Sequence, residues 1–219
     1  MKTVITVPQS AIKAVSYAMA VKDIRYYLNG MLVQHNGQET RLVATDGHRL
    51  HAGIVKHKGG ELLPEIVQAI IPDALVKTML KAKAGKHVPK EIVITIEGDN
   101  INADLFDNTS ASAKAIDGRF PDYSRVIPGK ASGEAAQFNP AYLADAEAGA
   151  QAWGDMKNIK PTFNHNGTSS GFLAIDGFVA VIMPRRGNSG MSAPDPAFRQ
   201  EMAVAAPVAV ASTATATGE

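Results

Sequence analysis

The sequence predicts an α+β fold made of three copies of one unit, in which a strand leads into a helix and further strands follow. Three prolines mark the predicted helix starts: Pro8, Pro72 and Pro140, which are 64 residues (8 to 72) and 68 residues (72 to 140) apart. Proline suits the first turn of a helix because its φ angle is preset and its missing N–H would have no partner there. This regular spacing indicates an internal repeat.

Each predicted element follows its proline in the same order. The helices show apolar residues at helical spacing: Ile12, Val15 and Met19, then Leu75, Met79 and Leu80, then Tyr142, Leu143 and Ala146. The strand-like runs are 30–35 and 40–45 in the first unit, 91–96 and 101–106 in the second, and 161–166, 171–175 and 178–184 in the third. Turn residues separate these runs: His35-Asn36-Gly37, Gly98-Asp99-Asn100, Asn166-Gly167 and Asp176-Gly177. The alternative is three unrelated α+β segments with chance prolines.

One unit has a one-sided helix and an open sheet, so it must pair to bury its apolar face. We expect the first two units to form a complete domain over 1–127. The third unit, 128–190, has no partner within the chain on this interpretation, and an odd number of units implies assembly between chains. The remainder, 191–219, is rich in Ala, Pro, Thr and Val and is expected to be a disordered tail.

Composition excludes several function classes. The chain is 45% hydrophobic, with no apolar run long enough to span a membrane and no signal-peptide pattern, so a cytoplasmic location is expected. The absence of cysteine excludes disulfides, thiol nucleophiles and thiolate metal sites. The net charge of +1 does not by itself indicate nucleic-acid binding, although charge can still gather on one face.

No pattern in the sequence predicts an enzyme. Asp46, His48 and His51 could suggest a metal site or a general base, but two histidines and one Asp in a single turn are weak evidence when no further ligand is placed beside them. P-loop, dinucleotide-binding and nucleophile-elbow motifs do not occur. We therefore expect no catalysis, no cofactor and no metal.

Three strings combine a turn with apolar residues and arginine: VATDGHRL at 43–50, DGRFPDYSRVIP at 117–128 and VIMPRR at 181–186. This chemistry suits the binding of a peptide. Each string also has an ordinary interpretation when taken alone. The first could be a hairpin turn at Asp46-Gly47, the second a turn at Pro121, and the third a strand ended by proline.

Taken together and in order, the strings resemble the bacterial sliding clamp family, the β subunit of DNA polymerase III. DIRYYLNGML at 23–32 and the first two strings resemble the middle domain of that family. QFNPAYLADA at 137–146 and VIMPRR resemble the second half of its last domain. The resemblance covers about residues 3–186, without counterparts of the first domain and of the first half of the last.

This resemblance implies a DNA-clamp fold of repeated half-domains, with helices lining a ring around double-stranded DNA and sheets outside. Such a clamp has no chemistry of its own and holds a polymerase on its template. The family's ring has twelve units and this chain has three, so a tetramer is expected over a trimer or dimer. The join could pair third units about a two-fold axis or run head-to-tail.

The resemblance also implies a pocket on the outer face for short apolar peptides of polymerases, clamp loaders and repair proteins. Apolar residues would form the slot and arginines its rim, with methionine adding adaptability. The implied residues are Leu28, Thr45, Gly47, His48, Arg49 and Leu50 from the first unit, Pro121, Arg125 and Val126 from the second, and Asn139, Tyr142, Val181, Met183, Pro184 and Arg186 from the third.

The DNA-facing residues implied in the same way are Lys13, Lys22, Arg25, Tyr26, Tyr27, Lys77, Lys81, Lys83 and Lys86. Lysines on helices could contact phosphates without reading bases, and this looseness permits sliding. The ordinary alternative is a solvated helix face. The third predicted helix, 139–154, has acidic residues and no lysine or arginine, so we expect little DNA contact there.

A second function stays open, because a shortened clamp could keep the pocket without encircling DNA. It would then act as an adaptor, or as a competitor for clamp-binding peptides of another replication machinery. Such a compact chain would suit a virus or mobile element.

Overall fold

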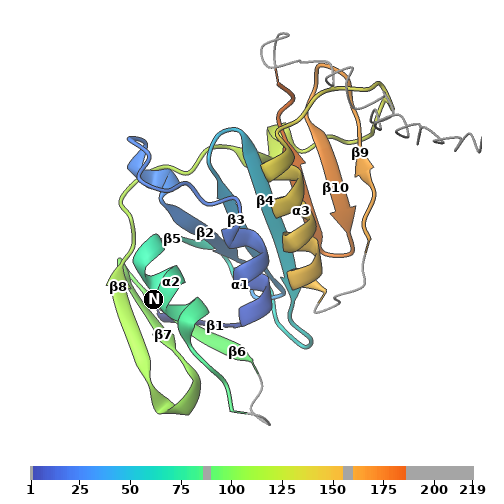
Figure 1. Ribbon diagram of the computed structural model, residues 1–219. Helices are drawn as coiled ribbons and strands as arrows, with labels where there is room; N and C mark the ends of the chain where they lie inside the picture. The colour runs from blue at the N-terminus through green and yellow to red at the C-terminus, as the bar shows by residue number, and fades with distance from the viewer. Residues whose placement is uncertain (1, 86–89, 155–159, 186–219) are drawn as a thin grey trace, which may run out of the picture. The chain divides into compact units, whose positions relative to one another are not determined.

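The computed structural model describes residues 2–85, 90–154 and 160–185, and within them each of the three predicted helices is followed by strands. The third helix departs from the predicted pattern, because no strand precedes it among the described residues. The first unit contains β1 (Lys2–Pro8), α1 (Gln9–Ser16), β2 (Gly30–His35), β3 (Glu39–Thr45) and β4 (Arg49–Lys56). The second contains β5 (Val67–Pro72), α2 (Asp73–Lys81), β6 (Glu91–Glu97), β7 (Asn100–Asp104) and β8 (Ser110–Lys114). The third contains α3 (Pro140–Trp153), β9 (Phe163–Asn164), β10 (Gly171–Ile175) and β11 (Phe178–Ile182). The fold is therefore α+β, as the sequence predicts (Figure 1).

The first two units exchange their first strands. β1 of the first unit pairs with β6 of the second, while β5 of the second pairs with β2 of the first. One sheet has the order β1-β6-β7-β8, and the other has the order β5-β2-β3-β4-β11-β10-β9. All of these pairings are antiparallel. Neither of the first two units is complete without a strand from the other.

The prolines lie at the helix starts, with a shift of one residue in two cases. Pro8 and Pro72 are the last extended residues before α1 and α2, and Pro140 is the first residue of α3. Asn139 precedes α3 and its side-chain oxygen accepts a hydrogen bond from the N–H of Ala141 at 3.1 Å. This bond satisfies one of the N–H groups that a helix start leaves free.

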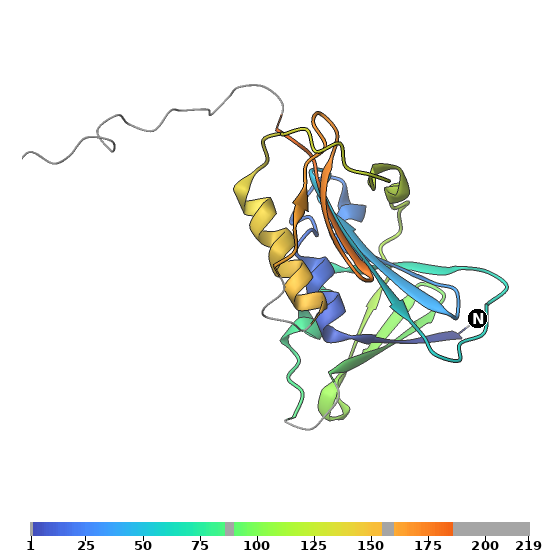
Figure 2. The same ribbon diagram turned by 90° about the vertical axis from the view of Figure 1, so that its right-hand side faces the viewer.

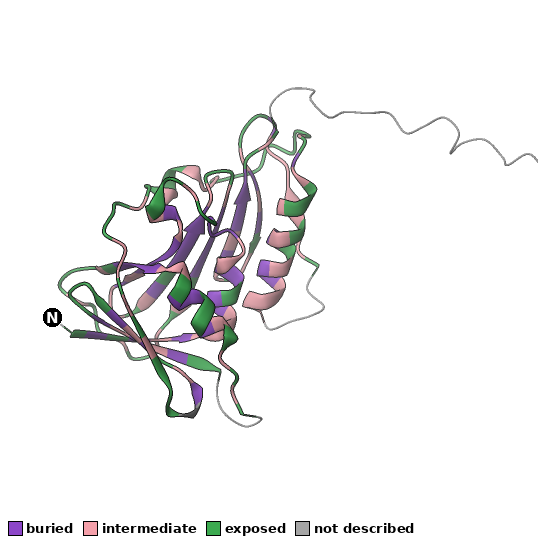
Figure 3. Ribbon diagram, turned by 60° about the vertical axis from the view of Figure 1, so that its left-hand side comes forward, coloured by how far each residue is buried: buried purple, intermediate pink, exposed green. Residues whose placement is uncertain are grey.

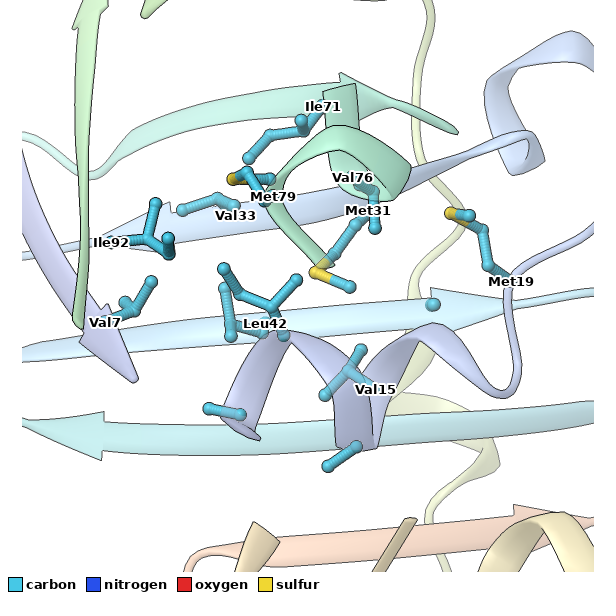
Figure 4. Close-up of a cluster of buried hydrophobic side chains, with 14 of the residues drawn as sticks. Val7, Val15, Met19, Met31, Val33, Leu42, Ile71, Val76, Met79 and Ile92 are labelled. Carbon is cyan, nitrogen blue, oxygen red and sulfur yellow. The ribbon is translucent and has the colours of Figure 1, made fainter. Parts of the chain in front are cut away.

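All three helices lie on one side of the sheets (Figure 2). The main core fills the space between, and buried residues concentrate along the middle of the strands (Figure 3). Met31, Leu42 and Ile71 from the seven-stranded sheet meet Val15 of α1 and Met79 of α2 (Figure 4). A second apolar cluster lies on the other face of that sheet and includes Leu32, Val43, Leu50 and Val181. The strands of the large sheet are thus covered on both faces, which explains their continuous apolar runs.

The expectation that the third unit has no partner within the chain is wrong. β11 pairs with β4 over five residue pairs, from Phe178–Gly53 to Ile182–Arg49, and α3 packs along α1. The Trp153 ring of α3 lies against Gly53, where a Cβ would come within 2.2 Å of it. The third unit therefore buries its apolar face on the first. Residues Met1–Arg185 group into one compact unit. The domain boundary at residue 127 stays a prediction, and the predicted tail lies outside the described residues.

His51 of β4 is buried where the first and third units meet. Its Nδ1–H donates to the carbonyl of Ala14 in α1 at 2.9 Å, and its ring contacts Phe178 edge-on at 5.4 Å between centroids. Nε2 has no hydrogen-bond partner among the described residues. Burial lowers the pKa of His51 from the ordinary 6.5 to about 4. The imidazole is therefore neutral in the folded protein near neutral pH.

This arrangement predicts that the free energy of unfolding falls at low pH because His51 is protonated in the unfolded chain before it is protonated in the folded one. Between pH 6.5 and 4 the unfolded chain binds a proton at His51 that the folded chain does not. The free energy of unfolding should therefore fall by about 3 kcal/mol as the pH is lowered through this range, and His51 should add no pH dependence above it. Urea unfolding of the wild type and of His51→Gln at a series of pH values measures the difference. His35, whose pKa burial also lowers, is present in both proteins. Equal pH slopes in the two proteins would contradict this account.

Candidate functional site

A pocket of about 220 Å³ lies where segments from all three units meet. Its floor is apolar, since Leu50 and Val181 are buried side by side on paired strands β4 and β11. Met183, which follows β11, lies at the wall and is 39% exposed. The remaining walls come from the β3–β4 turn, from the η1 segment (Tyr26–Leu28) and from the η3 segment (Tyr123–Val126). Such a pocket can take an apolar side chain of a ligand.

The β3–β4 turn is set by its own side chains. The Asp46 carboxylate accepts hydrogen bonds from the N–H groups of His48 at 2.8 Å and Arg49 at 3.0 Å. The Thr45 hydroxyl donates to the carbonyl of Arg49 at 2.7 Å and accepts from the N–H of Gly47 at 3.1 Å. Gly47 has a φ of +89°, which strongly favours glycine. The turn is therefore a rigid wall of the pocket.

Arg25 covers this turn. Its Nη2 donates to the carbonyl of Asp46 at 3.0 Å and lies 2.7 Å from the Asp23 carboxylate. A Cβ at Gly47 would come within 2.8 Å of the guanidinium, so the flexible Arg25 side chain would have to shift if another residue stood there. The hydrogen bond from Arg25 lowers the pKa of Asp23 to about 2. Asp23 therefore stays ionised and holds Arg25 at the edge of the pocket.

Arg49 connects the first unit to the third at the pocket. Its Nε donates to Asp46 at 3.1 Å and its Nη1 to Asp145 of α3. The guanidinium also stands over the Tyr142 ring, 4.5 Å from the ring centroid. Charge and cation–π attraction both hold the side chain in place. The polar rim of the pocket is thus fixed before any ligand arrives.

The structure brings ten of the sequence-predicted pocket residues into one lining: Leu28, Thr45, Gly47, His48, Arg49, Leu50, Pro121, Val126, Val181 and Met183. Four others do not line it. Tyr142 lies beneath Arg49, Asn139 caps α3, Pro184 follows β11, and Arg125 points to solvent and pairs with Asp122 at 2.8 Å. Arg186 lies outside the described residues.

Four residues complete the lining that were not predicted for it. Asp122 and Tyr123 belong to the string at 117–128 but were not singled out. Tyr123 is held by a hydrogen bond from its hydroxyl to the Gln34 side chain at 2.8 Å. Arg25 and Tyr27, which were expected to face DNA, also line the pocket. Tyr123 lies one helical turn before Val126, which was predicted, and this spacing is the signal in the sequence that could have indicated Tyr123.

The other residues expected to face DNA are exposed where the structure describes them. Lys13 lies on α1, Lys77 and Lys81 lie on α2, and Lys83 follows α2. Lys77 pairs with Asp73 within α2 at 2.6 Å. Lys22 and Tyr26 are exposed in the segment between α1 and β2, and Lys86 lies outside the described residues. The lysines of both helices thus belong to the layer on one side of the sheets (Figure 2).

Residues 6–122 match the family model of the DNA polymerase III beta subunit, central domain. The chain belongs to this family. It is 41% identical over 127 residues to the beta sliding clamp of Escherichia coli K12, an alignment that covers 56% of this chain and 33% of that protein. It is 38% identical over 117 residues to the beta sliding clamp of Vibrio cholerae, which covers 53% and 30%. The chain thus matches about a third of the length of these curated relatives.

Solved clamp structures share the fold over more of the chain. The sliding clamp from Pseudomonas aeruginosa with ligand superposes with a TM-score of 0.64 at 24% identity, over 84% of this chain and 66% of that one. The beta subunit from Thermotoga maritima gives a TM-score of 0.68 at 17% identity, over 84% and 65%. The clamp fold predicted from the sequence is therefore confirmed.

No group of three or more His, Cys, Asp or Glu side chains within 2–85, 90–154 and 160–185 could hold a metal ion. No helix in the same part of the chain has the length and apolar character needed to cross a membrane.

The geometry predicts that Arg49 and Asp145 stabilise the contact between the first and third units. A double-mutant cycle with Arg49→Met and Asp145→Asn should give a coupling free energy of about 1 kcal/mol, because the Arg49 side chain is only 13% exposed. Urea unfolding of the four proteins measures it. The matched control is the more exposed pair Arg41–Glu39, with 48% and 27% exposed side chains, which should couple less. A coupling no larger than that of the control would contradict the assignment.

Proposed function

We propose that the protein is a sliding clamp that holds a polymerase and other partners on DNA through short peptides bound in its pocket. The observation that carries this proposal is the composition of the pocket. An apolar floor from β4 and β11 is enclosed by a fixed turn and by arginines anchored to carboxylates. The relatives with which the chain shares its central-domain sequence are named beta sliding clamps.

The pocket suits a peptide with apolar anchors such as leucine or phenylalanine. A volume of about 220 Å³ accommodates one or two such side chains, with Leu50 and Val181 beneath them. Met183 can adjust its side-chain torsions to different anchors because methionine is unbranched and polarizable. At the rim Arg25 and Arg49 can donate hydrogen bonds to peptide carbonyls. One site could therefore serve several partners.

In the proposed clamp the helix layer faces double-stranded DNA. Exposed lysines on α1 and α2 would attract phosphates without distinguishing bases, and α3 would contribute little because it has no lysine or arginine. Such contacts weaken with salt and permit sliding. The protein supplies no chemistry in this role, needs no cofactor, and would act on DNA in the cytoplasm of a bacterial cell.

A ring requires several copies of the chain. Four chains would provide the twelve units of the family's ring, and we propose this tetramer over a trimer or dimer. The proposal rests on the unit count alone, because the third unit is not left without a partner in its own chain.

One observation favours a second candidate function, that of a non-ring adaptor or competitor for clamp-binding peptides. The third unit packs on the first within the chain, so the described part buries its apolar faces without another copy. Retention on nicked circular DNA separates the candidates. A ring stays on the circle and is lost when the DNA is linearised, whereas an adaptor is not retained on either.

The pocket assignment predicts that Leu50→Ala combined with Met183→Ala weakens peptide binding by about tenfold or more, because both changes remove apolar wall from the anchor site. Fluorescence anisotropy with a labelled peptide carrying leucine and phenylalanine anchors measures the affinity. Leu62→Ala is the matched control, since Leu62 is 64% exposed and does not line the pocket. Met183→Ala alone keeps the test valid if the loss of buried Leu50 impairs folding. Unchanged affinity in folded variants would refute the assignment.

If the exposed lysines of α2 contact DNA, reversing the charge of Lys77 and Lys81 to Glu should reduce the affinity for duplex DNA severalfold at low salt, because phosphates would then meet carboxylates. Peptide affinity should be unchanged, since neither lysine lines the pocket. The control reverses Lys56 and Lys58, two exposed lysines at the end of β4 and just after it. An equal loss of DNA affinity in both double variants would argue against a specific helix face.

A further inference from the structure

A second cavity, of about 690 Å³, lies beside the candidate site and takes no part in the proposed function. Its described lining comes from the first two units alone, whereas the candidate site draws on all three. Pro121, Asp122 and Tyr123 line both, so this short stretch of chain separates the two spaces. Ligand sites commonly have volumes of about 300–1,000 Å³. The second cavity is therefore large enough for a ligand, and a ligand in the candidate site reaches it by crossing three residues.

The floor of the second cavity is the face of the large sheet that carries the second apolar cluster, at the point where β2 pairs with β5. Leu32 lies opposite Ile70 and Gln34 lies opposite Gln68, so the floor has one apolar pair and one polar pair. The Tyr123 hydroxyl donates to Oε1 of Gln34 at 2.8 Å, and Nε2 of Gln34 donates to Oε1 of Gln68 at 3.3 Å. These bonds leave the N–H groups of the Gln68 amide without an acceptor among the described residues.

The segment 117–121, which follows β8, forms one wall of the second cavity. The N–H of Ile116, just before it, donates to the carbonyl of Ile70 in β5 at 2.9 Å. Gly118 lies against Tyr27, since a Cβ at Gly118 would come within 2.9 Å of the Tyr27 Cβ atom. The segment is thus held in place on the sheet before any ligand binds.

The backbone of this wall is free to bind a ligand. Within the described residues, 117–121 makes no hydrogen bond to another backbone group. Most of the segment is exposed, so water satisfies its N–H and carbonyl groups in the free protein. An extended peptide offers a donor and an acceptor at each residue and can replace that water, as peptides do when they pair with the edge of a sheet. The wall therefore suits a ligand that has a main chain.

The charged side chains of the second cavity balance one another. They are Lys114, Arg119, Asp99 and Asp117, and Asp122 is already paired with an arginine of η3 at 2.8 Å. None of the first four forms an ion pair within the described part of the chain. Two cations beside two anions do not favour a phosphate group or DNA, and the connecting segment lies on the side of the large sheet away from the helices (Figure 2). The ligand is therefore not selected by its net charge.

We propose that the second cavity binds the residues of a partner peptide that flank its apolar anchors, and that it binds them through their main chain. This rests on the proposed function, because the anchors must first lie in the candidate site. The flanking residues would cross Pro121–Tyr123, hydrogen-bond to the backbone of 117–121 and meet the Gln68 amide at the floor. Their side chains would matter little, so different partners could use the second cavity without sharing a sequence in the flank.

Peptide length tests this proposal on the full chain. The anchor peptide is the labelled peptide with leucine and phenylalanine anchors used for the candidate site. Two longer peptides add six residues of alternating alanine and serine, either before or after the anchors. Because the second cavity lies beyond one wall of the candidate site, extension at one end should tighten binding about fivefold or more, and extension at the other end should not. Fluorescence anisotropy measures the three dissociation constants.

Methylation of the peptide backbone tests whether the main chain is the part that binds. In the longer peptide that binds more tightly, N-methyl groups on all six added residues remove their N–H donors and keep their side chains. The affinity should then fall back to that of the anchor peptide. The matched control replaces the added serines by alanine, which keeps every backbone donor and should keep the gain in affinity.

A substitution in the floor tests the cavity from the side of the protein. Gln68→Ala removes the free amide donors of the second cavity and leaves the candidate site unchanged, because Gln68 does not line that site. The longer peptide should bind about two- to threefold more weakly, while the anchor peptide should bind as it does to the wild type. Gln38→Ala is the matched control, since Gln38 is exposed and lines neither cavity.

Equal affinity of the anchor peptide and both longer peptides would overturn the proposal and leave the second cavity to another kind of ligand. Equal affinity of the methylated and unmethylated flanks would also overturn it, as would a folded Gln68→Ala variant in which the longer peptide loses no more affinity than the anchor peptide. Circular dichroism establishes that the variant is folded. Binding of the anchor peptide without a gain from the flank counts against the second cavity alone. If the anchor peptide does not bind at all, the candidate site fails, and the flank site fails with it.

Discussion

Backbone pairing between β4 and β11 joins the two paired strands that are farthest apart in the sequence of the described residues. Once these strands lie side by side, α3 must lie along α1, because each helix follows the sheet of its own unit. His51 is then enclosed between them, and Arg49 comes within reach of α3. The same pairing places Leu50 beside Val181 as the pocket floor. The core contact and the candidate site therefore depend on one set of ladder hydrogen bonds.

The structure of the pocket is determined partly by neighbouring residues and partly by contacts between distant segments. Its turn at 45–49 is determined locally, through Asp46, Thr45 and the positive φ of Gly47, and needs little from the rest of the fold. Its shape is determined at long range, because Val181 and Met183 arrive from the third unit and Tyr123 from the segment that crosses the sheet. A locally fixed rim above a floor formed by long-range contacts suits recognition of a short peptide, since the protein loses little conformational entropy when the ligand binds.

The features that the sequence predicts well are the local ones. Proline and the apolar spacing after it indicate the three helices, because both depend on neighbouring residues. The strand exchange between β1 and β5 and the pairing of β11 could not be predicted from the residues alone, because nothing in a run such as FVAVI specifies which edge it joins. For the same reason Tyr27 was not predicted for the pocket that it lines: an aromatic residue in a connecting segment can turn either way until the surrounding strands are placed.

The exchange of first strands also has a consequence for how the chain can be divided. The first two units are interlaced, so a cut between them would strip a strand from each sheet and leave two incomplete fragments. The third unit exchanges no strand with either of them and is attached through one strand edge and one helix face. It is the modular part of the molecule, because its removal would leave both exchanged strands in place and would uncover the edge of β4 and the face of α1.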